Sequence, residues 1–194
     1  DVCSSDLAYA LQANTTANNN TSVGYQSLYS NTTGSDLVAF GYGALNSNTT
    51  ANDNHAFGRS ALGSNTTGTA NTAIGSRALT SNTTASNNTA VGYQAGYSNT
   101  TGQVTAFGNA TLYKNTTGTG NNGFGIFTLY NNTTGSSNTA IGENALQSNT
   151  TASNNTAVGY QAGYNSTGGQ NLFLGYQAGY GTTSGTNNTF VGSG

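Results

Sequence analysis

The stretch NTAIGSRALTSNTTASN (residues 71–87) is followed directly by NTAVGYQAGYSNTTG (residues 88–102), so the same phrase begins again at Asn88. An apolar residue followed by glycine recurs in this way along the chain, at Gly24, Gly41, Gly58, Gly75, Gly92, Gly108, Gly125, Gly142, Gly159, Gly175 and Gly192. Eight of the ten intervals between these glycines have the same length, and the other two, after Gly92 and after Gly159, are shorter by a single residue. A period of about 17 residues is too short for a propeller blade or a helical hairpin, and it predicts one coil of a β-solenoid or β-roll.

Each unit shows two short runs of β-branched, aromatic and small residues, separated by the glycine and closed by an Asn-Thr-Thr loop. These signals predict an all-β fold, a parallel β-solenoid or β-roll of about eleven 17-residue coils with two short strands per coil. The residue before each glycine is always large and apolar, and we expect this set to form the core. It comprises Val23, Phe40, Phe57, Ile74, Val91, Phe107, Phe124, Ile141, Val158, Leu174 and Val191.

Neighbouring residues of a strand point to opposite faces, and both faces of each expected strand carry apolar residues. A solitary solenoid buries one face and leaves the other in water. The double-sided pattern therefore predicts that the outer face packs on further copies of the chain in a coaxial homo-oligomer, with a single-chain solenoid as the alternative.

The sequence also repeats with a longer period of four coils. Residues 81–97 are identical to residues 148–164, and the offset between them equals four successive coils, one of which is a short one. This identity indicates duplication of a four-coil block, and lengthening by duplication suits a fibre better than an active site. We expect residues 8–194 to form a single repeat array within a longer fibre. Residues 1–7 break the pattern and resemble translated sequencing adapter, so Cys3 is interpreted as non-native; a divergent first coil is the alternative.

The composition excludes several classes of function. The chain of 194 residues contains 34 Thr, 30 Asn and 28 Gly but only eight charged residues, and its net charge is −2. Nucleic acid or an anionic membrane surface would require clustered Lys and Arg, which are missing. No apolar run approaches the roughly 20 residues of a membrane-spanning helix, so no membrane insertion is expected. Strict apolar periodicity favours an ordered chain over a disordered one.

The loop of each unit presents Asn-x-Thr, the acceptor pattern for N-linked sugar, in ten consecutive coils. The candidate glycosylation sites are Asn14, Asn31, Asn48, Asn65, Asn82, Asn99, Asn115, Asn132, Asn149 and Asn165. The paired threonines are alternative acceptors for O-linked sugar. An equally weighted alternative is that Asn and Thr hydrogen-bond the turn backbone and one another in ladders.

No arrangement of residues indicates catalysis. His55 stands where other coils usually have Thr, and Asp36, Asp53 and Glu143 fall in different coils, so neither a triad nor a carboxylate pair is indicated. An aspartate in every repeat, as in calcium-binding β-rolls, is also missing. We expect no enzyme activity, no metal and no cofactor. Rows of tyrosine directly after the glycine and five residues after it are assigned mainly to packing, although aromatic rows also bind sugar rings.

The strings at Asn71–Gly75, Asn88–Gly92 and Asn138–Gly142 resemble the head repeats of trimeric autotransporter adhesins. Those heads are trimeric, left-handed parallel β-rolls with an alanine, an aliphatic residue and a glycine in this order. The resemblance implies a trimer and an adhesin-like stalk. It covers residues 8–194 as a pattern, and it departs from those heads in its longer unit and its Asn-Thr-Thr loop. Similar repeats occur in tail-fibre-like surface proteins.

Together these features predict an extracellular or cell-surface structural fibre, an adhesin-like stalk that is glycosylated at its loop tips and assembles with copies of itself. A receptor-binding tail-fibre module and an ice-binding solenoid are the alternatives. Ice binding requires threonines at alternate positions of a strand, all facing one way. The Thr-Thr pairs of this chain are instead adjacent and lie in a loop.

Overall fold

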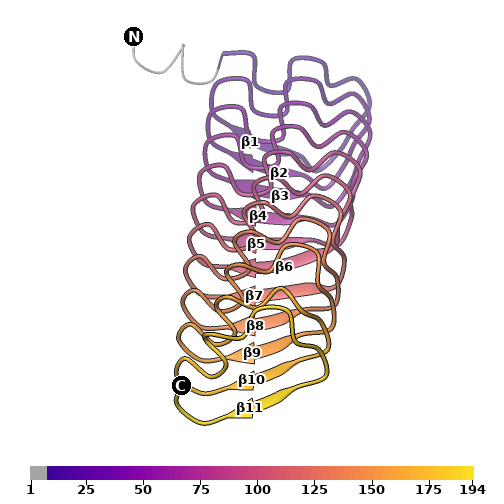
Figure 1. Cartoon of the computed structure of the whole chain (residues 1–194). Helices are drawn as coiled ribbons and strands as arrows, with labels where there is room; N and C mark the ends of the chain where they lie inside the picture. Colours follow the sequence, from indigo (N-terminus) through magenta and orange to yellow (C-terminus); the bar gives the residue numbers. More distant parts are fainter. Residues whose placement is uncertain (1–7) are drawn as a thin grey trace.

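The computed structural model describes residues 8–194, so residues 1–7, with the interpretation placed on Cys3, lie outside the described part. The chain winds into a regular stack of similar coils, with one short strand in each coil from β1 near the N-terminal end to β11 at the other (Figure 1). The strands are β1 (Thr21–Val23), β2 (Val38–Phe40), β3 (His55–Phe57), β4 (Thr72–Ile74), β5 (Thr89–Val91), β6 (Val104–Phe107), β7 (Asn121–Phe124), β8 (Thr139–Ile141), β9 (Thr156–Val158), β10 (Leu172–Leu174) and β11 (Thr189–Val191).

All eleven strands form one parallel sheet in the order of the sequence, so ten turns lead from β1 to β11. The pairing keeps equivalent residues side by side: Ala73 lies opposite Ala90. The register also holds across a short interval, because Val91 lies opposite Phe107. The predicted parallel β-solenoid is therefore confirmed.

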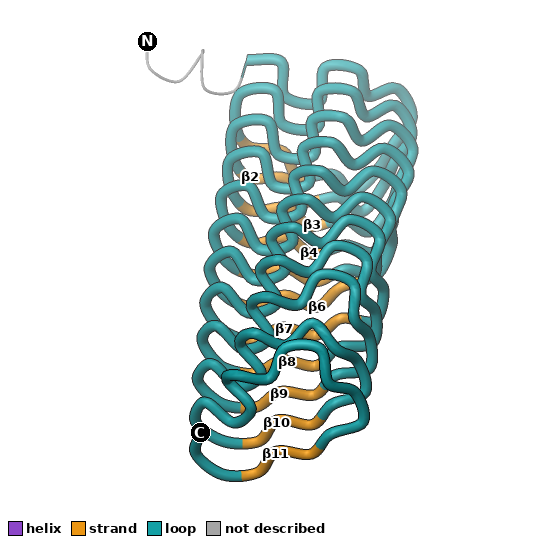
Figure 2. The backbone as a smooth tube through the Cα atoms, viewed as in Figure 1, coloured by secondary structure: helices purple, strands orange, loops and turns teal. Residues whose placement is uncertain are grey.

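The prediction of a second strand in each coil is wrong. The segment after the glycine is drawn as loop in every coil (Figure 2), because its backbone alternates in handedness. In the first complete coil Gln26 has φ of 54° and Leu28 has φ of 51°, values that no strand adopts. The segment still binds its neighbours, since the Leu28 N–H donates to the Ala44 carbonyl of the next coil at 3.0 Å. Each coil is thus one strand plus a run of turns that are hydrogen-bonded from coil to coil.

The core is a narrow column of small and medium side chains. The middle residue of most strands is a fully buried alanine, such as Ala73 and Ala90, and it packs against fully buried leucines from the segment after the glycine. These leucines are Leu28, Leu45, Leu62, Leu79, Leu112, Leu129 and Leu146. Because each coil encloses little space, only alanine fits opposite leucine in most coils.

One end of the column exchanges large and small residues between these two positions. Phe173 replaces the strand alanine in β10 and is fully buried, and glycine takes the place of leucine at Gly163 and Gly179. A Cβ atom added to Gly163 would lie 2.7 Å from Cδ2 of Phe173, so the ring needs the space that glycine leaves. The total volume inside the coil is kept, as close packing demands.

Candidate interaction surface

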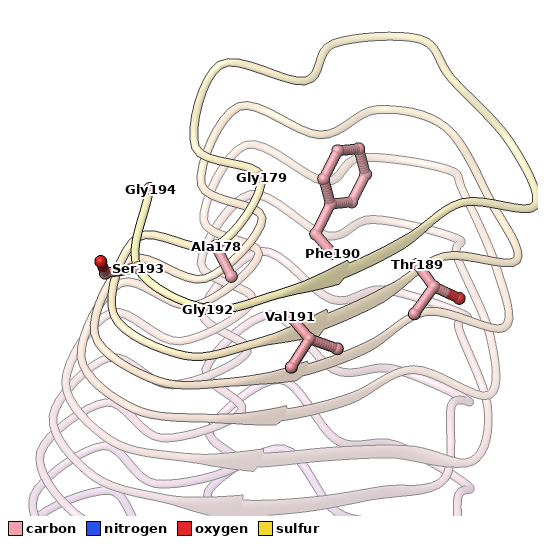
Figure 3. A pocket seen from close by; sticks show the side chains of 8 residues that line it. All are labelled: Ala178, Gly179, Thr189, Phe190, Val191, Gly192, Ser193 and Gly194. Carbon is pink, nitrogen blue, oxygen red and sulfur yellow. The ribbon is translucent and has the colours of Figure 1, made fainter.

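The outward face of the sheet presents two parallel rows of side chains. In each strand the residue before the buried middle position and the residue after it both point away from the coil. Figure 3 shows this alternation in β11, where Phe190 points into the coil and Thr189 and Val191 point out of it. We call the row before the middle residue the threonine row. It comprises Thr21, Val38, His55, Thr72, Thr89, Thr105, Asn122, Thr139, Thr156, Leu172 and Thr189.

We call the row after the middle residue the apolar row, and it consists of the eleven residues that precede the repeat glycines. The sequence assigned these residues to the core, and that assignment is wrong for the single chain. Phe57 is 40% exposed and Ile74 is 43% exposed, and the rest of the row is exposed except for Val91 and Val158, which are half-buried. Each strand has one inward position, and alanine occupies it in most coils. The apolar row of Val23, Phe40, Phe57, Ile74, Val91, Phe107, Phe124, Ile141, Val158, Leu174 and Val191 faces outward instead.

Two pairs of phenylalanine rings in the apolar row stack along the rod. The rings of Phe40 and Phe57 lie 5.4 Å apart at 7°, and those of Phe107 and Phe124 lie 5.3 Å apart at 7°. Such stacked pairs stabilise each other beyond the area that they bury. Within the two rows, His55 is the only residue with an ionisable side chain. The face is therefore a nearly uncharged strip of ordered apolar and hydroxyl groups.

The ten candidate glycosylation asparagines do not form a row of exposed loop tips. Eight of them, from Asn31 to Asn149, have no exposed surface at all. Asn14 is exposed and Asn165 is half-buried; Ser166 takes the position in the ladder where Asn165 was expected. The turn folds the asparagine inward, because its amide satisfies backbone groups that the turn leaves open. The hydrogen-bonded ladder, which was the alternative for these residues, is the arrangement found. The eight, Asn31, Asn48, Asn65, Asn82, Asn99, Asn115, Asn132 and Asn149, are therefore corrected from surface acceptors to buried ladder residues.

The asparagine ladder runs in one direction. The Nδ2 of Asn48 donates to Oδ1 of Asn31 at 3.0 Å and to the Ala51 carbonyl at 3.0 Å, and the same two bonds recur in the following coils. The ladder ends at Asn149, whose Oδ1 has no hydrogen-bond partner among the described residues. Ser166 in the next coil is too short to reach it, and its own Oγ also lacks a partner.

A second buried asparagine ladder was missed in the sequence. It lies just before the strands, where the Nδ2 of Asn71 donates to Oδ1 of Asn54 at 3.1 Å and that of Asn88 donates to Asn71 at 3.0 Å. Leu37 and Val104 interrupt it, and both are buried. The signal was present, because the repeated phrase begins with Asn in most coils. Asparagine is common in exposed turns, so its burial was not evident from its type alone.

The two threonines of each loop have different environments. The Oγ1 of the first threonine donates to a carbonyl of the next coil, as Thr32 does to Thr49 at 3.0 Å and Thr66 to Thr83 at 3.0 Å. The second threonine, such as Thr33 or Thr67, is exposed, and its hydroxyl makes no hydrogen bond to another described residue. The first threonine joins coils, while the second faces solvent.

Tyrosines on the turn side of the coil stack in two interrupted rows. Tyr25 stacks on Tyr42 at 5.3 Å in the row directly after the glycine. Tyr97, Tyr113 and Tyr130 stack at 5.1 Å in the row five residues after it. The packing role expected for these rings is the one that the structure displays.

Among the polar residues considered for catalysis, Asp36 and Asp53 occupy equivalent positions of adjacent coils, where the Asp53 N–H donates to the Ser35 carbonyl. His55 is exposed on β3, and Glu143 lies in a coil far from both Asp36 and Asp53 along the rod. Within residues 8–194, no three His, Cys, Asp or Glu side chains gather in a way that would hold a metal ion. The same residues contain no helix that is long and apolar enough to cross a membrane.

A hollow of about 310 Å³ lies over the last described coil. It is lined by residues 178–179 and 189–194 (Figure 3). Over each earlier strand, the same space is occupied by the following coil. Phe173 is fully buried in this way, whereas Phe190 is only half-buried. The hollow is therefore a feature of coil stacking and not a shaped ligand site.

The fold and surface define a parallel β-solenoid with one exposed apolar and hydroxyl face. Comparisons of the chain with protein families, with characterised proteins and with solved structures gave no match.

Proposed function

We propose that the chain is part of an extracellular structural fibre, an adhesin-like or tail-fibre-like stalk in which the apolar row packs on copies of the chain. The observation that carries the proposal is the exposure of this row on strand after strand over the whole sheet. The largest exposed apolar patch on a soluble protein is often functional, and a continuous row of this kind is typical of an interaction site. A matching row on a second copy is the partner that fits a nearly uncharged, periodic strip.

The dimensions predict how strong this association is. Eleven strands stacked about 4.8 Å apart span about 50 Å, and three residues of strand are about 10 Å wide. The strip then covers about 500 Å², which is less than the roughly 800 Å² per partner of a standard stable interface. Association should therefore be moderate for this length of rod and should grow with each added coil. A trimer, the number implied by the resemblance, would bring three such rows to a common axis.

The test places charge on the apolar row. We expect the unchanged chain to form a concentration-dependent oligomer in analytical ultracentrifugation, and the double variant Ile74→Lys/Ile141→Lys to stay monomeric, because each lysine would have to be desolvated in the interface. Ile126→Lys is the matched control, since Ile126 is 45% exposed but lies in the segment after a repeat glycine, off the sheet. A monomeric unchanged chain, or an oligomer that survives the double variant, would overturn the proposal.

We propose that glycans are attached to the accessible side chains and not to the buried asparagines. The second threonine of each pair offers an exposed, unbonded hydroxyl in coil after coil, and Asn14 is the exposed one of the ten candidate asparagines. Intact mass and site mapping of protein secreted from a glycosylating host test this part. Sugar on Asn65 or Asn82 would contradict it, because both are fully buried.

Ice binding is a second candidate function. It is supported by the threonine row of the sheet face and not by the Thr-Thr pairs of the loops. Thr72, Thr89 and Thr105 occupy the same outward position of consecutive strands. A row of threonines that face one way from a regular sheet favours this function, although threonine takes only one outward position of each strand and the alternate one is apolar. Thermal hysteresis that disappears in Thr72→Lys/Thr89→Lys would favour this function over the fibre.

A further inference from the structure

A hollow of about 360 Å³ opens on the turn segments of the coils between β1 and β5, and none of its lining residues belongs to the two rows of the sheet face. Its floor is formed by Gly43 and Gly63 together with Ser60. A Cβ atom on Gly63 would lie 3.3 Å from the Ser60 carbonyl oxygen and 3.6 Å from that of Gly43, so these three residues meet at one point. The volume lies at the lower end of the range of small-molecule sites.

The hollow exists because the position five residues after the repeat glycine carries no aromatic ring in three adjacent coils. The place of Gly63 is taken by Tyr29 two coils earlier and by Tyr97 two coils later, and Asn46 and Thr80 stand between them. The tyrosine row is thus interrupted for three successive coils. An aromatic ring stands at this position of the row in Tyr97, Tyr113 and Tyr130, so the row lacks a six-membered ring here.

The lining is polar and uncharged. Gln26, Asn46, Ser47, Ser64 and Thr80 surround the glycine floor. Asn46 donates from Nδ2 to the Gln26 carbonyl at 3.1 Å, and Thr80 donates from Oγ1 to the Ser60 carbonyl at 2.9 Å, so both side chains are held in place. The Ser47 and Ser64 hydroxyls are half-buried and make no hydrogen bond to another described residue. The site therefore offers fixed walls and free hydroxyl groups, each of which both donates and accepts.

Tyr42 forms the aromatic wall of the hollow. Its ring is stacked at 5.3 Å on Tyr25, and the guanidinium carbon of Arg59 lies 5.9 Å from its centre, so both ring faces have neighbours. A ligand meets the edge of this ring and its phenol group. Ionised side chains do not line the hollow, which disfavours phosphate, carboxylate or ammonium ligands.

We infer that this hollow binds a neutral pyranose sugar, in the form of a free glycoside or a unit of a larger glycan. A pyranose ring is similar in size to the tyrosine ring that the row lacks, the hollow has room for its substituents, and its several hydroxyls would pair with Ser47, Ser64 and Asn46 without any charge. The inference is independent of the fibre proposal, because the hollow and the apolar row share no residue.

The decisive variant restores the interrupted tyrosine row. Gly63→Tyr should fill the hollow and abolish binding, and it should fold, because tyrosine occupies the equivalent position at Tyr97 and Tyr113. Gln147→Tyr is the matched control, since it adds the same ring to the same row in a coil outside the hollow. Ser47→Ala/Ser64→Ala removes only two hydroxyls and should weaken binding by about tenfold, as expected for two lost hydrogen bonds of about 0.5–1 kcal/mol each.

The measurement is chemical-shift perturbation of the isotope-labelled chain with lactose, maltose, cellobiose and N-acetylglucosamine as probes, with glucuronate and glucosamine as charged controls. We expect shifts at Gly43, Ser47 and Gly63 with at least one neutral probe, unchanged in Gln147→Tyr and lost in Gly63→Tyr. Lack of shifts with every neutral probe, equal shifts in Gly63→Tyr, or a response to the charged probes alone would overturn the inference.

Discussion

A buried asparagine side chain has two amide protons to donate and an oxygen that accepts. In the ladder one proton is donated within the coil, and the other proton and the oxygen find their partners in the two neighbouring coils. Asn82 illustrates the arrangement: its Nδ2 donates to Asn65 and to the Ala85 carbonyl, and its Oδ1 accepts from Asn99 at 3.2 Å. The burial of an amide is unfavourable unless every group is paired. The ladder is therefore stable only when the repeat is continuous, and each asparagine depends on its two neighbours.

Asn82→Ala should lower the stability of the rod by about 2–4 kcal/mol, because Oδ1 of Asn65 is left without its donor and Asn99 loses one acceptor. The shift of the urea unfolding midpoint measures this change. Asn109→Ala is the control, since Asn109 is exposed and its side chain makes no hydrogen bond to a described residue. An equal effect of the two substitutions would mean that the ladder contributes nothing specific.

Ser166→Asn should have the opposite effect. It places an amide donor over Oδ1 of Asn149, which lacks a partner, and the expected gain is about 1 kcal/mol. The same urea experiment measures it, with Ser166→Ala as the control that removes a hydroxyl without adding a donor. A midpoint that falls in Ser166→Asn would show that the coil around Gly168 and Gly169 cannot admit the longer side chain.

At the scale of the element, the coil could be predicted in part from the sequence. Its length, its parallel stacking and the strand before each glycine followed from the spacing alone, since equivalent residues must lie side by side in a solenoid. The turns that replace the second strand could not be predicted from the spacing. They require leucine with a positive φ, which costs roughly 1–2 kcal/mol and is rare. Burial of its side chain, worth about 1.5–3 kcal/mol, offsets that cost. The exchange of Leu for Gly at Gly96, Gly163 and Gly179 was the available signal of a positive φ.

The core and the candidate site were harder to place for a related reason. Periodicity of two shows that Ala and its apolar neighbour point to opposite faces, but it does not say which face is inside. The larger residue was assigned to the interior on the ground of burial area. The narrow coil reverses this order, because there is room for alanine opposite leucine and not for phenylalanine. Phe173 enters the interior only where glycine faces it at Gly163 and Gly179.

Gly41→Ala should disrupt its coil. Gly41 has φ of +129°, a conformation that side chains with a Cβ atom avoid, and a Cβ there would lie 2.7 Å from the carbonyl carbon and oxygen of Gly58. We expect a loss of about 3 kcal/mol or more, or local unfolding of β2, measured by urea denaturation and hydrogen exchange. Gly181→Ala is the matched control, because a Cβ at Gly181 meets nothing within 4 Å.

At the scale of the whole molecule, the rod is a linear array whose coils contact only their neighbours. Such an array should tolerate loss of whole blocks, since every internal interface has the same form. The identity of residues 81–97 with residues 148–164 marks where a block can be removed without creating a new junction.

Deletion of residues 82–148 joins Ser81 to Asn149 and removes one complete four-coil block. The shortened chain should keep its circular dichroism spectrum, and small-angle scattering should show a rod shorter by about 19 Å, the height of four strand spacings. Deletion of residues 82–140, which ends inside a coil, should instead unfold the junction. If both deletions behave alike, register between coils is not what holds the rod together.

The one-way asparagine ladders also give the rod an electrical polarity. Every bond from Nδ2 to Oδ1 along the two ladders runs toward the N-terminal end, as from Asn48 to Asn31 and from Asn88 to Asn71. Amide dipoles of about 3.5 D that are aligned head to tail sum to partial charges at the two ends, as they do in a helix. Within each uninterrupted stretch of a ladder, the end toward β1 is then electropositive and the end toward β11 electronegative. Rods that meet end to end would attract one another head to tail and repel one another head to head, so a filament of this chain would be polar, with two distinguishable ends.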